Sequence, residues 1–255
     1  MTADPVDVVL TIDRGNSTLD CRVHAAGLAR RERLDPADAS AFAAFLGDLH
    51  IDRAAGCSVV ARGLDLARTE LHRRGVRLRV AGAELICPLS IGYDDPRELG
   101  HDRWVAAVGA RQVFGDALIV DCGTAVTFGC VFRDGRYQPG PIGAGLTTTA
   151  HALGGRAPAL PAFDGQVARS WPPRGTLDAI RAGVGGQFAV AVEATVARLL
   201  DSVRRERDEA WQPTLVVTGG DANGFLAFAS LDWRTAPELV HEGLRHLDRA
   251  CASSC

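Results

Sequence analysis

Residues 8–23 read VVLTIDRGNSTLDCRV, and residues 117–132 read ALIVDCGTAVTFGCVF. Each stretch places an apolar strand before Asp-x-Gly and a hydroxyl residue, and each continues into a second apolar run. This pattern predicts two β-hairpins that turn at their Asp-x-Gly segments. One copy arises often by chance, but two copies with the same downstream hydroxyl residue indicate an internal duplication. The sequence therefore predicts two lobes built on one plan.

Outside the hairpins, apolar residues with helical and strand periods alternate, which favours α/β architecture. The patterns predict strands at 57–61, 76–80 and 215–217, and helices at 41–49, 64–74, 104–114, 176–207, 222–229 and 238–249. Residues 154–174 are rich in Pro, Ala, Gly and Arg, so they are expected to form a surface loop. A chain of 255 residues has room for two domains. We expect the division to give residues 1–115 and 116–255.

The composition excludes several classes of site. All 28 residues of the Lys and Arg total are Arg. The lack of lysine excludes a Walker-A phosphate site, a Schiff-base enzyme and a protein-kinase ATP lysine. The net charge of −3 and the lack of a basic block argue against nucleic-acid binding. No apolar stretch approaches the ~20 residues needed to cross a bilayer.

The cysteines and the start of the chain bear on location. Seven cysteines show neither CxxC pairs nor zinc-ribbon spacing, which argues against a disulfide scaffold or a zinc module. The first residues carry acids and no positive charge, unlike a signal peptide. We therefore expect a reduced, cytoplasmic enzyme that neither spans a membrane nor binds nucleic acid.

An Asp-x-Gly turn at a strand end suits phosphate binding. Glycine lets the backbone approach a phosphate, whose oxygens can accept from backbone N–H groups, and the next Ser or Thr adds a hydroxyl donor. The Asp repels phosphate and must act through a cation or its water. Two such hairpins can hold a polyphosphate and its metal without lysine.

Further motifs follow along the chain in a fixed order. They are Asp13-Arg14-Gly15-Asn16-Ser17, Tyr93-Asp94-Asp95-Pro96, Leu99-Gly100-His101-Asp102-Arg103, Asp121 to Thr127, Pro139 to Gly145 in part, and Thr218 to Asp221. Together they resemble the type III pantothenate kinase family, within the superfamily of acetate and sugar kinases, heat-shock ATPases and actin. The resemblance implies a two-lobed, duplicated ribonuclease H-like (actin-like ATPase) α/β fold, with mixed sheets flanked by helices.

The resemblance also implies an activity, namely the ATP-dependent phosphorylation of pantothenate to 4′-phosphopantothenate, the first step of coenzyme A biosynthesis. Asp102 matches the family's general base, and Asp121 matches the ligand of a monovalent cation, K⁺ or NH₄⁺, that acts beside Mg²⁺. The implied ATP contacts are Asp13, Arg14, Gly15, Asn16, Ser17, Thr18, Leu19, Asp20, Thr124, Gly219 and Gly220. The implied substrate contacts are Tyr93, Gly100, His101, Asp102, Arg103 and Thr176. A homodimer is implied as well.

Some residues depart from the family pattern or allow a simpler interpretation. Gly129 stands where the family commonly has an acid. This change leaves one alternative open, a catalytically weak or inactive member with a regulatory or accessory role. A separate alternative is a kinase of another small hydroxyl acceptor. Asp102 and Arg103, taken alone, would be interpreted as a surface ion pair. His241 and His246 lack the spacing of a zinc site and are expected to be solvated helix histidines.

Overall fold

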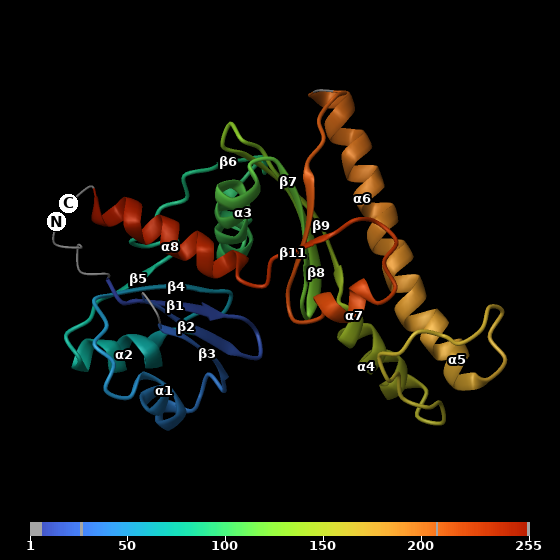
Figure 1. Cartoon of the computed structure of the whole chain (residues 1–255), viewed down its shortest axis with the longest axis horizontal. Helices are drawn as coiled ribbons and strands as arrows, with labels where there is room; N and C mark the ends of the chain where they lie inside the picture. Colours follow the sequence, from blue (N-terminus) through green and yellow to red (C-terminus); the bar gives the residue numbers. More distant parts are fainter. Residues whose placement is uncertain (1–6, 26–27, 208, 254–255) are drawn as a thin grey trace. The chain divides into compact units, whose positions relative to one another are not determined.

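The computed structural model describes residues 7–25, 28–207 and 209–253. The described residues form two compact units (Figure 1). Unit 1 contains the chain up to Val113, Gly135–Tyr137 and the segment from Glu238 onward, and unit 2 contains Phe114–Asp134 and Gln138–Pro237. A division at residue 115 assigns the C-terminal segment to the second lobe. In the structure this segment belongs to unit 1, because its helix packs on two of that unit's strands.

Unit 1 is built on a five-stranded sheet of order β3-β2-β1-β4-β5. Its strands are β1 (Val9–Arg14), β2 (Leu19–Ala25), β3 (Leu28–Leu34), β4 (Arg53–Ser58) and β5 (Leu78–Val80). Its helices are α1 (Ala39–Leu46), α2 (Asp65–Arg73), α3 (His101–Phe114) and α8 (Leu239–Ala252), with a short 3-10 helix at Pro96–Glu98. β2 runs antiparallel to β1 and β3, whereas β4 runs parallel to β1 and β5.

The two faces of this sheet differ in polarity. Leu10 and Ile12 of β1 are fully buried and pair with Val23 and Cys21 of β2. Helices α1 and α2 cover this apolar face (Figure 1). Because strand residues alternate between faces, Thr11 points to the opposite face, where α8 packs. This second face is polar, and the site described below is built on it.

Ion pairs attach α8 to the polar face, and the pairs of Asp248 are buried. The Asp248 carboxylate is buried and lies 2.6 Å from the Arg79 guanidinium and 3.0 Å from that of Arg53. At the start of the helix, Glu238 pairs with Arg22 of β2. Removing one partner of such a buried pair leaves an uncompensated charge and is strongly destabilising. The C-terminal helix is therefore an integral part of unit 1.

Unit 2 repeats the strand order of unit 1. Its strands are β7 (Ala117–Cys122), β8 (Ala125–Val131), β9 (Arg136–Ala144), β10 (Thr214–Thr218) and β11 (Arg234–Thr235). They have the order β11-β10-β7-β8-β9, with β7–β8 antiparallel and β7–β10 and β10–β11 parallel. The start of β9, at Arg136 and Tyr137, belongs to unit 1 and pairs there with the short strand β6 (Ser90–Ile91). The equivalent hairpins β1–β2 and β7–β8 are the two repeated stretches of sequence. The predicted duplication and fold class are confirmed.

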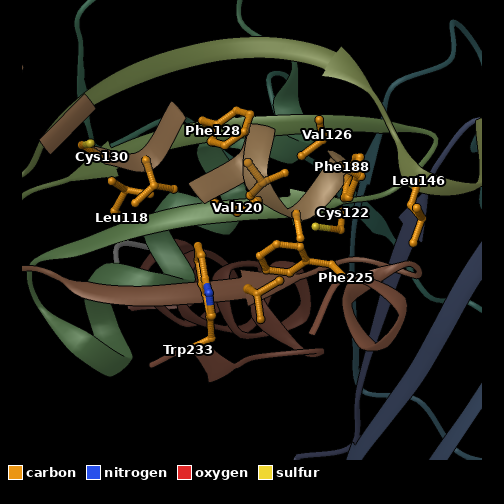
Figure 2. Close-up of a cluster of buried hydrophobic side chains, with 14 of the residues drawn as sticks. Leu118, Val120, Cys122, Val126, Phe128, Cys130, Leu146, Phe188, Phe225 and Trp233 are labelled. Carbon is orange, nitrogen blue, oxygen red and sulfur yellow. The ribbon is translucent and has the colours of Figure 1, made fainter. Parts of the chain in front are cut away.

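Strands β7 and β8 present the apolar core of unit 2 (Figure 2). The helices of this unit are α4 (Leu146–Arg156), α5 (Thr176–Ile180), α6 (Gln187–Glu206) and α7 (Ala222–Leu226). Side chains that alternate along β7 face the rings of Phe225 and Trp233, which meet edge to face at 5.2 Å. This core holds the β7–β8 turn in place.

Several elements differ from those that the sequence predicts. β3 was not expected because Arg30, Arg31, Glu32 and Arg33 make it highly charged, but charged residues are typical of an edge strand. The helix α4 was not expected, and its last three residues lie in the loop expected at 154–174. The predicted long helix at 176–207 exists, but a π-helical segment at Arg181–Gly186 separates α5 from α6.

No helix in the described part of the chain is long and apolar enough to span a membrane.

Candidate active site

The β1–β2 turn presents polar groups to solvent. The Gly15 amide donates to the Thr18 carbonyl at 3.1 Å, so this amide closes the turn itself. Asn16, Ser17 and Thr18 are exposed. The Arg14 guanidinium donates to the Gly15 carbonyl. The groups that the turn presents to solvent are therefore the side-chain amide of Asn16 and the hydroxyls of Ser17 and Thr18. The Gly15 N–H, which the sequence suggested as a phosphate donor, is used within the turn.

Asp13 is a half-buried carboxylate at the end of β1, just before this turn. The Cys57 thiol of β4 donates to its Oδ1 at 3.4 Å. Burial raises the pKa of Asp13, the charges of Asp102 and Asp20 raise it further, and His241 and the Cys57 hydrogen bond lower it. A carboxylate in this setting gains from a nearby cation.

Asp20 lies opposite Asp13 in the β1–β2 ladder, and its carboxylate contacts side chains of β3 and α8. The guanidinium groups of Arg31 and Arg33 lie 2.7 and 3.1 Å from its Oδ2, and His241 Nε2 lies 3.4 Å from its Oδ1. Burial opposes ionisation of Asp20, but hydrogen bonds from His241 and Arg31 hold its pKa well below the usual range. Asp20 therefore fixes the hairpin to the neighbouring strand β3.

Asp102 lies in the first turn of α3 and is half-buried. Burial raises the pKa of Asp102, while a hydrogen bond from the Arg103 backbone and the charge of the Arg103 side chain lower it. The Arg103 guanidinium donates to the Tyr93 hydroxyl at 3.0 Å, which joins the two parts of the 93–103 segment. The preceding His101 ring fills the space above Gly82, where a Cβ would collide with it.

In unit 2, three loops meet at the end of β7. The Gly145 amide donates to the Thr124 carbonyl at 3.0 Å, and the Asp221 amide donates to the Cys122 carbonyl at 2.8 Å. Gly219 adopts a positive φ of 94°, and a Cβ there would run into the Cys122 carbonyl and the Asp121 carboxylate. The chain at 219 must therefore be glycine for the loops to meet.

Comparison with known proteins assigns the chain to a family. The sequence model of type III pantothenate kinases matches residues 9–198, well over half of the chain. The chain belongs to this family. The resemblance inferred from the motifs is thereby confirmed, and the chain is a kinase.

Named relatives agree with this assignment. A type III pantothenate kinase of Alkalilimnicola ehrlichii is 38% identical over 173 residues, which cover 67% of each chain. One of Nitratidesulfovibrio vulgaris is 36% identical over 208 residues, which cover 79% of this chain and 77% of the relative. These names favour neither a regulatory role nor a different acceptor.

A solved structure shows the same fold. It is that of a Campylobacter jejuni protein assigned to the Baf family of transcriptional activators, with a TM-score of 0.63 and 18% identity. The superposition covers 96% of this chain and 99% of that chain.

The structure assigns the predicted site residues of this family member to two groups. Unit 1 holds the β1–β2 turn with Asp13, and also Tyr93, Asp102 and Arg103; the charges of Asp13 and Asp102 influence each other. Leu19 is buried in the apolar core, so only its backbone adjoins the turn. Unit 2 holds the other group, which comprises Thr124, Asp121, Gly219, Gly220 and the exposed Thr176 at the start of α5.

Sequence reasoning missed several residues at these sites. His241 was expected to be solvated. This expectation is wrong, because His241 is only 2% exposed. Helical spacing was an available signal, since His241 shares a face with Leu244 and Asp248, both fully buried. The link from Thr147 to the Asp221 carboxylate, at 2.7 Å between hydroxyl and Oδ1, has no local sequence signal.

The donor set of this kinase suits a magnesium nucleotide rather than a preformed metal cage. Among the described residues, no group of three or more His, Cys, Asp or Glu side chains is arranged to hold a metal ion. Mg²⁺ usually takes one or two protein carboxylates together with substrate phosphates. Asp13, whose pKa is raised by burial, fits as such a carboxylate.

Proposed function

We propose that Asp102 is the general base of this enzyme, which transfers the γ-phosphoryl group of ATP to pantothenate. The product is 4′-phosphopantothenate, and the reaction is the first step of coenzyme A biosynthesis. The observation that carries the proposal is a half-buried carboxylate with a raised pKa, next in sequence to the arginine that binds Tyr93. Perturbed carboxylates of this kind are typical of catalytic positions.

The reaction does not require a strong base. The primary hydroxyl oxygen of pantothenate forms a bond to the γ-phosphorus, the bond from this phosphorus to the β–γ bridging oxygen breaks, and ADP leaves. The hydroxyl proton passes to the Asp102 carboxylate. Because phosphoryl transfer is largely dissociative, positioning and late proton removal matter more than the strength of the base.

Arg103 and Tyr93 are proposed to hold pantothenate. The acceptor carries a carboxylate, and the Arg103 guanidinium supplies a planar, permanently charged partner for such a group. Tyr93 accepts from Arg103 and so orients it. Gly100, His101 and Thr176 remain predicted substrate contacts.

The proposed ATP contacts are polar groups of the two hairpin turns. In unit 1, Asn16, Ser17 and Thr18 would donate to phosphate oxygens, and Asp13 would hold Mg²⁺ or one of its waters. Bound Mg²⁺ neutralises charge on the β- and γ-phosphates. In unit 2, the proposed ATP contacts are Thr124, Gly219 and Gly220, and the Asp121 carboxylate would be one oxygen ligand of K⁺ or NH₄⁺.

A homodimer is proposed as well, on the basis of the family resemblance and of one surface of unit 2. A groove of about 690 Å³ is lined by Val167, Trp171, Val190 and Phe228. Trp171 is 83% exposed and Val190 68% exposed. An apolar patch of this kind is typical of a protein contact. A cytoplasmic location stays a prediction from the sequence.

The direct test is product formation. The purified chain with ATP, Mg²⁺, K⁺ and pantothenate is expected to release ADP and to yield 4′-phosphopantothenate by mass spectrometry. A panel of sugars and small hydroxy acids under the same conditions is expected to give no ADP above background. Turnover of a panel member in place of pantothenate would overturn the assignment of the acceptor.

The activity is expected to fall at acid pH. Asp102 must be ionised to accept the proton, and burial raises its pKa. As the pH falls through this raised pKa, kcat/KM should decrease with a slope of about one. The pKa of Asp13 is also raised, so the decrease of kcat/KM at acid pH reports the coupled titration of Asp13 and Asp102. The measurement is kcat/KM between about pH 4 and 8 at fixed ionic strength, and a profile flat to its acid end would contradict the role of Asp102.

A further inference from the structure

The strongest unused feature of unit 1 is a buried polar chain beneath α8. His241 Nδ1 lies 2.7 Å from the Thr11 hydroxyl, and His24 Nε2 lies 2.8 Å from the same oxygen. The other ring nitrogen of His241, Nε2, lies 3.4 Å from Asp20 Oδ1. One side chain from the C-terminal helix thus reaches both strands of the β1–β2 hairpin.

The chemistry of these groups determines which nitrogen of His241 carries a proton toward Asp20. The ionised Asp20 can only accept, so His241 Nε2 carries the proton on that side. The Thr11 hydroxyl lies within hydrogen-bond distance of His241 Nδ1 and of His24 Nε2, so it can donate to one ring and accept from the other. Burial and the charge of Arg245 lower the pKa of His24 to about 4, which agrees with a neutral ring. Both ring nitrogens of His241 thus have a polar partner, which restrains the position of the ring.

The position of this chain connects it to the nucleotide turn. Thr11 and Asp13 lie two residues apart on the same face of β1, and Asp20 pairs with Asp13 across the ladder. The bonds of His241 to Thr11 and Asp20 therefore flank the backbone that carries Asp13. The turn with Asn16, Ser17 and Thr18 begins two residues beyond Asp13. Loss of these bonds would let the turn shift relative to the phosphates it binds.

The same helix also contacts α3, on which Asp102 lies. A Cβ on Gly243 would collide with the Val105 carbonyl, and a Cβ on Gly109 would collide with that of Leu239. The two helix backbones are therefore in direct contact. α8 thus joins the hairpin that holds the nucleotide to the helix that carries the base, all within unit 1.

We infer that His241 is a positioning residue, which holds the β1–β2 turn in the geometry that binds the phosphates of ATP. Position 241 lies outside the segment that the family model matches, residues 9–198. His241 acts through Thr11 and Asp20 and touches no substrate. The inference rests on the proposed ATP contacts of the turn, and its test separates the two.

Three substitutions separate the effects of the two contacts of His241, one to Thr11 and one to Asp20. His241→Leu removes both, His241→Gln places an amide nitrogen near Nε2 and keeps the Asp20 bond, and His241→Asn keeps the Thr11 bond. Leaving buried polar groups unpaired costs about ten- to a hundredfold in an equilibrium constant. We expect His241→Leu to weaken binding of a non-hydrolysable ATP analogue with Mg²⁺ by that factor, with Gln and Asn intermediate.

The readouts are calorimetric Kd for the analogue, KM for ATP and for pantothenate, and the melting temperature. His246→Gln is the matched control, because His246 lies on the same helix and has no hydrogen bond to the hairpin; it should leave all four values unchanged. A rise in KM for ATP with unchanged KM for pantothenate, and partial recovery of ATP binding in His241→Gln, support the inference. An equal rise of both KM values indicates general loss of structure and overturns it.

The remaining outcomes are also decisive. An unchanged Kd in His241→Leu overturns the inference whatever the melting temperature does. If His241→Leu does not fold, the Gln and Asn variants decide, and binding equal to that of the unsubstituted chain in both would overturn it. If the unsubstituted chain binds the analogue but does not phosphorylate pantothenate, the proposed acceptor is wrong, while the Kd series still decides the role of His241.

Discussion

Asp102→Asn is expected to lower kcat by about a hundred- to ten-thousandfold, the usual contribution of a general base. Asn is close in shape to Asp but cannot accept the proton of the acceptor hydroxyl. Because burial raises the pKa of Asp102, the folded state disfavours its charged form. Asn removes this charge, so the melting temperature should stay unchanged or rise. Steady-state kinetics and thermal denaturation measure the two effects.

The matched control is Asp65→Asn. Asp65 also lies in the first turn of a helix in unit 1, but it faces solvent and pairs with Arg62. Surface pairs contribute about 0–1 kcal/mol, so this variant should keep its kcat and lose little stability. Near-normal turnover by Asp102→Asn would rule out Asp102 as the base. Equal losses in both variants would point to an effect of helix-terminal charge.

Gly243→Ala is expected to destabilise unit 1 by about 3 kcal/mol, at the upper end of the effect of overpacking. The new Cβ would overlap the carbonyl carbon and oxygen of Val105, and a backbone carbonyl cannot rotate away as a side chain does. Helices α3 and α8 would have to separate, which disturbs the packing of the buried Leu239 and Leu244. Calorimetric unfolding measures the change.

Gly154→Ala provides the control for this prediction. Gly154 lies within helix α4, and a Cβ there would meet nothing within 4 Å. Alanine favours a helix interior over glycine by about 0.5–1 kcal/mol, so this variant should be slightly more stable than the unsubstituted chain. If Gly243→Ala has the same melting temperature as Gly154→Ala, the close approach of α3 and α8 is not tight enough to require glycine.

Much of the fold could be predicted from the sequence because the signals were local. The two Asp-x-Gly hairpins follow from strand patterns and turn chemistry, and the same strand order in both sheets confirms the duplication. The charged strand β3 was missed because its pairing with β2, not its own pattern, makes it a strand. Helix α4, which begins with consecutive threonines after Leu146, lacks a strong local helix signal.

By itself, the sequence determined the repeated hairpins, the absence of lysine and the ordered motifs, since each of these depends on residues near one another in the chain. Only the tertiary structure decided which side chains support those motifs. His241 bonds to Thr11 from 230 positions away, and Asp248 bonds to Arg79 from 169 positions away. The folding of the C-terminal helix onto unit 1 brings these partners together, because burying its apolar face and pairing Asp248 both require that sheet.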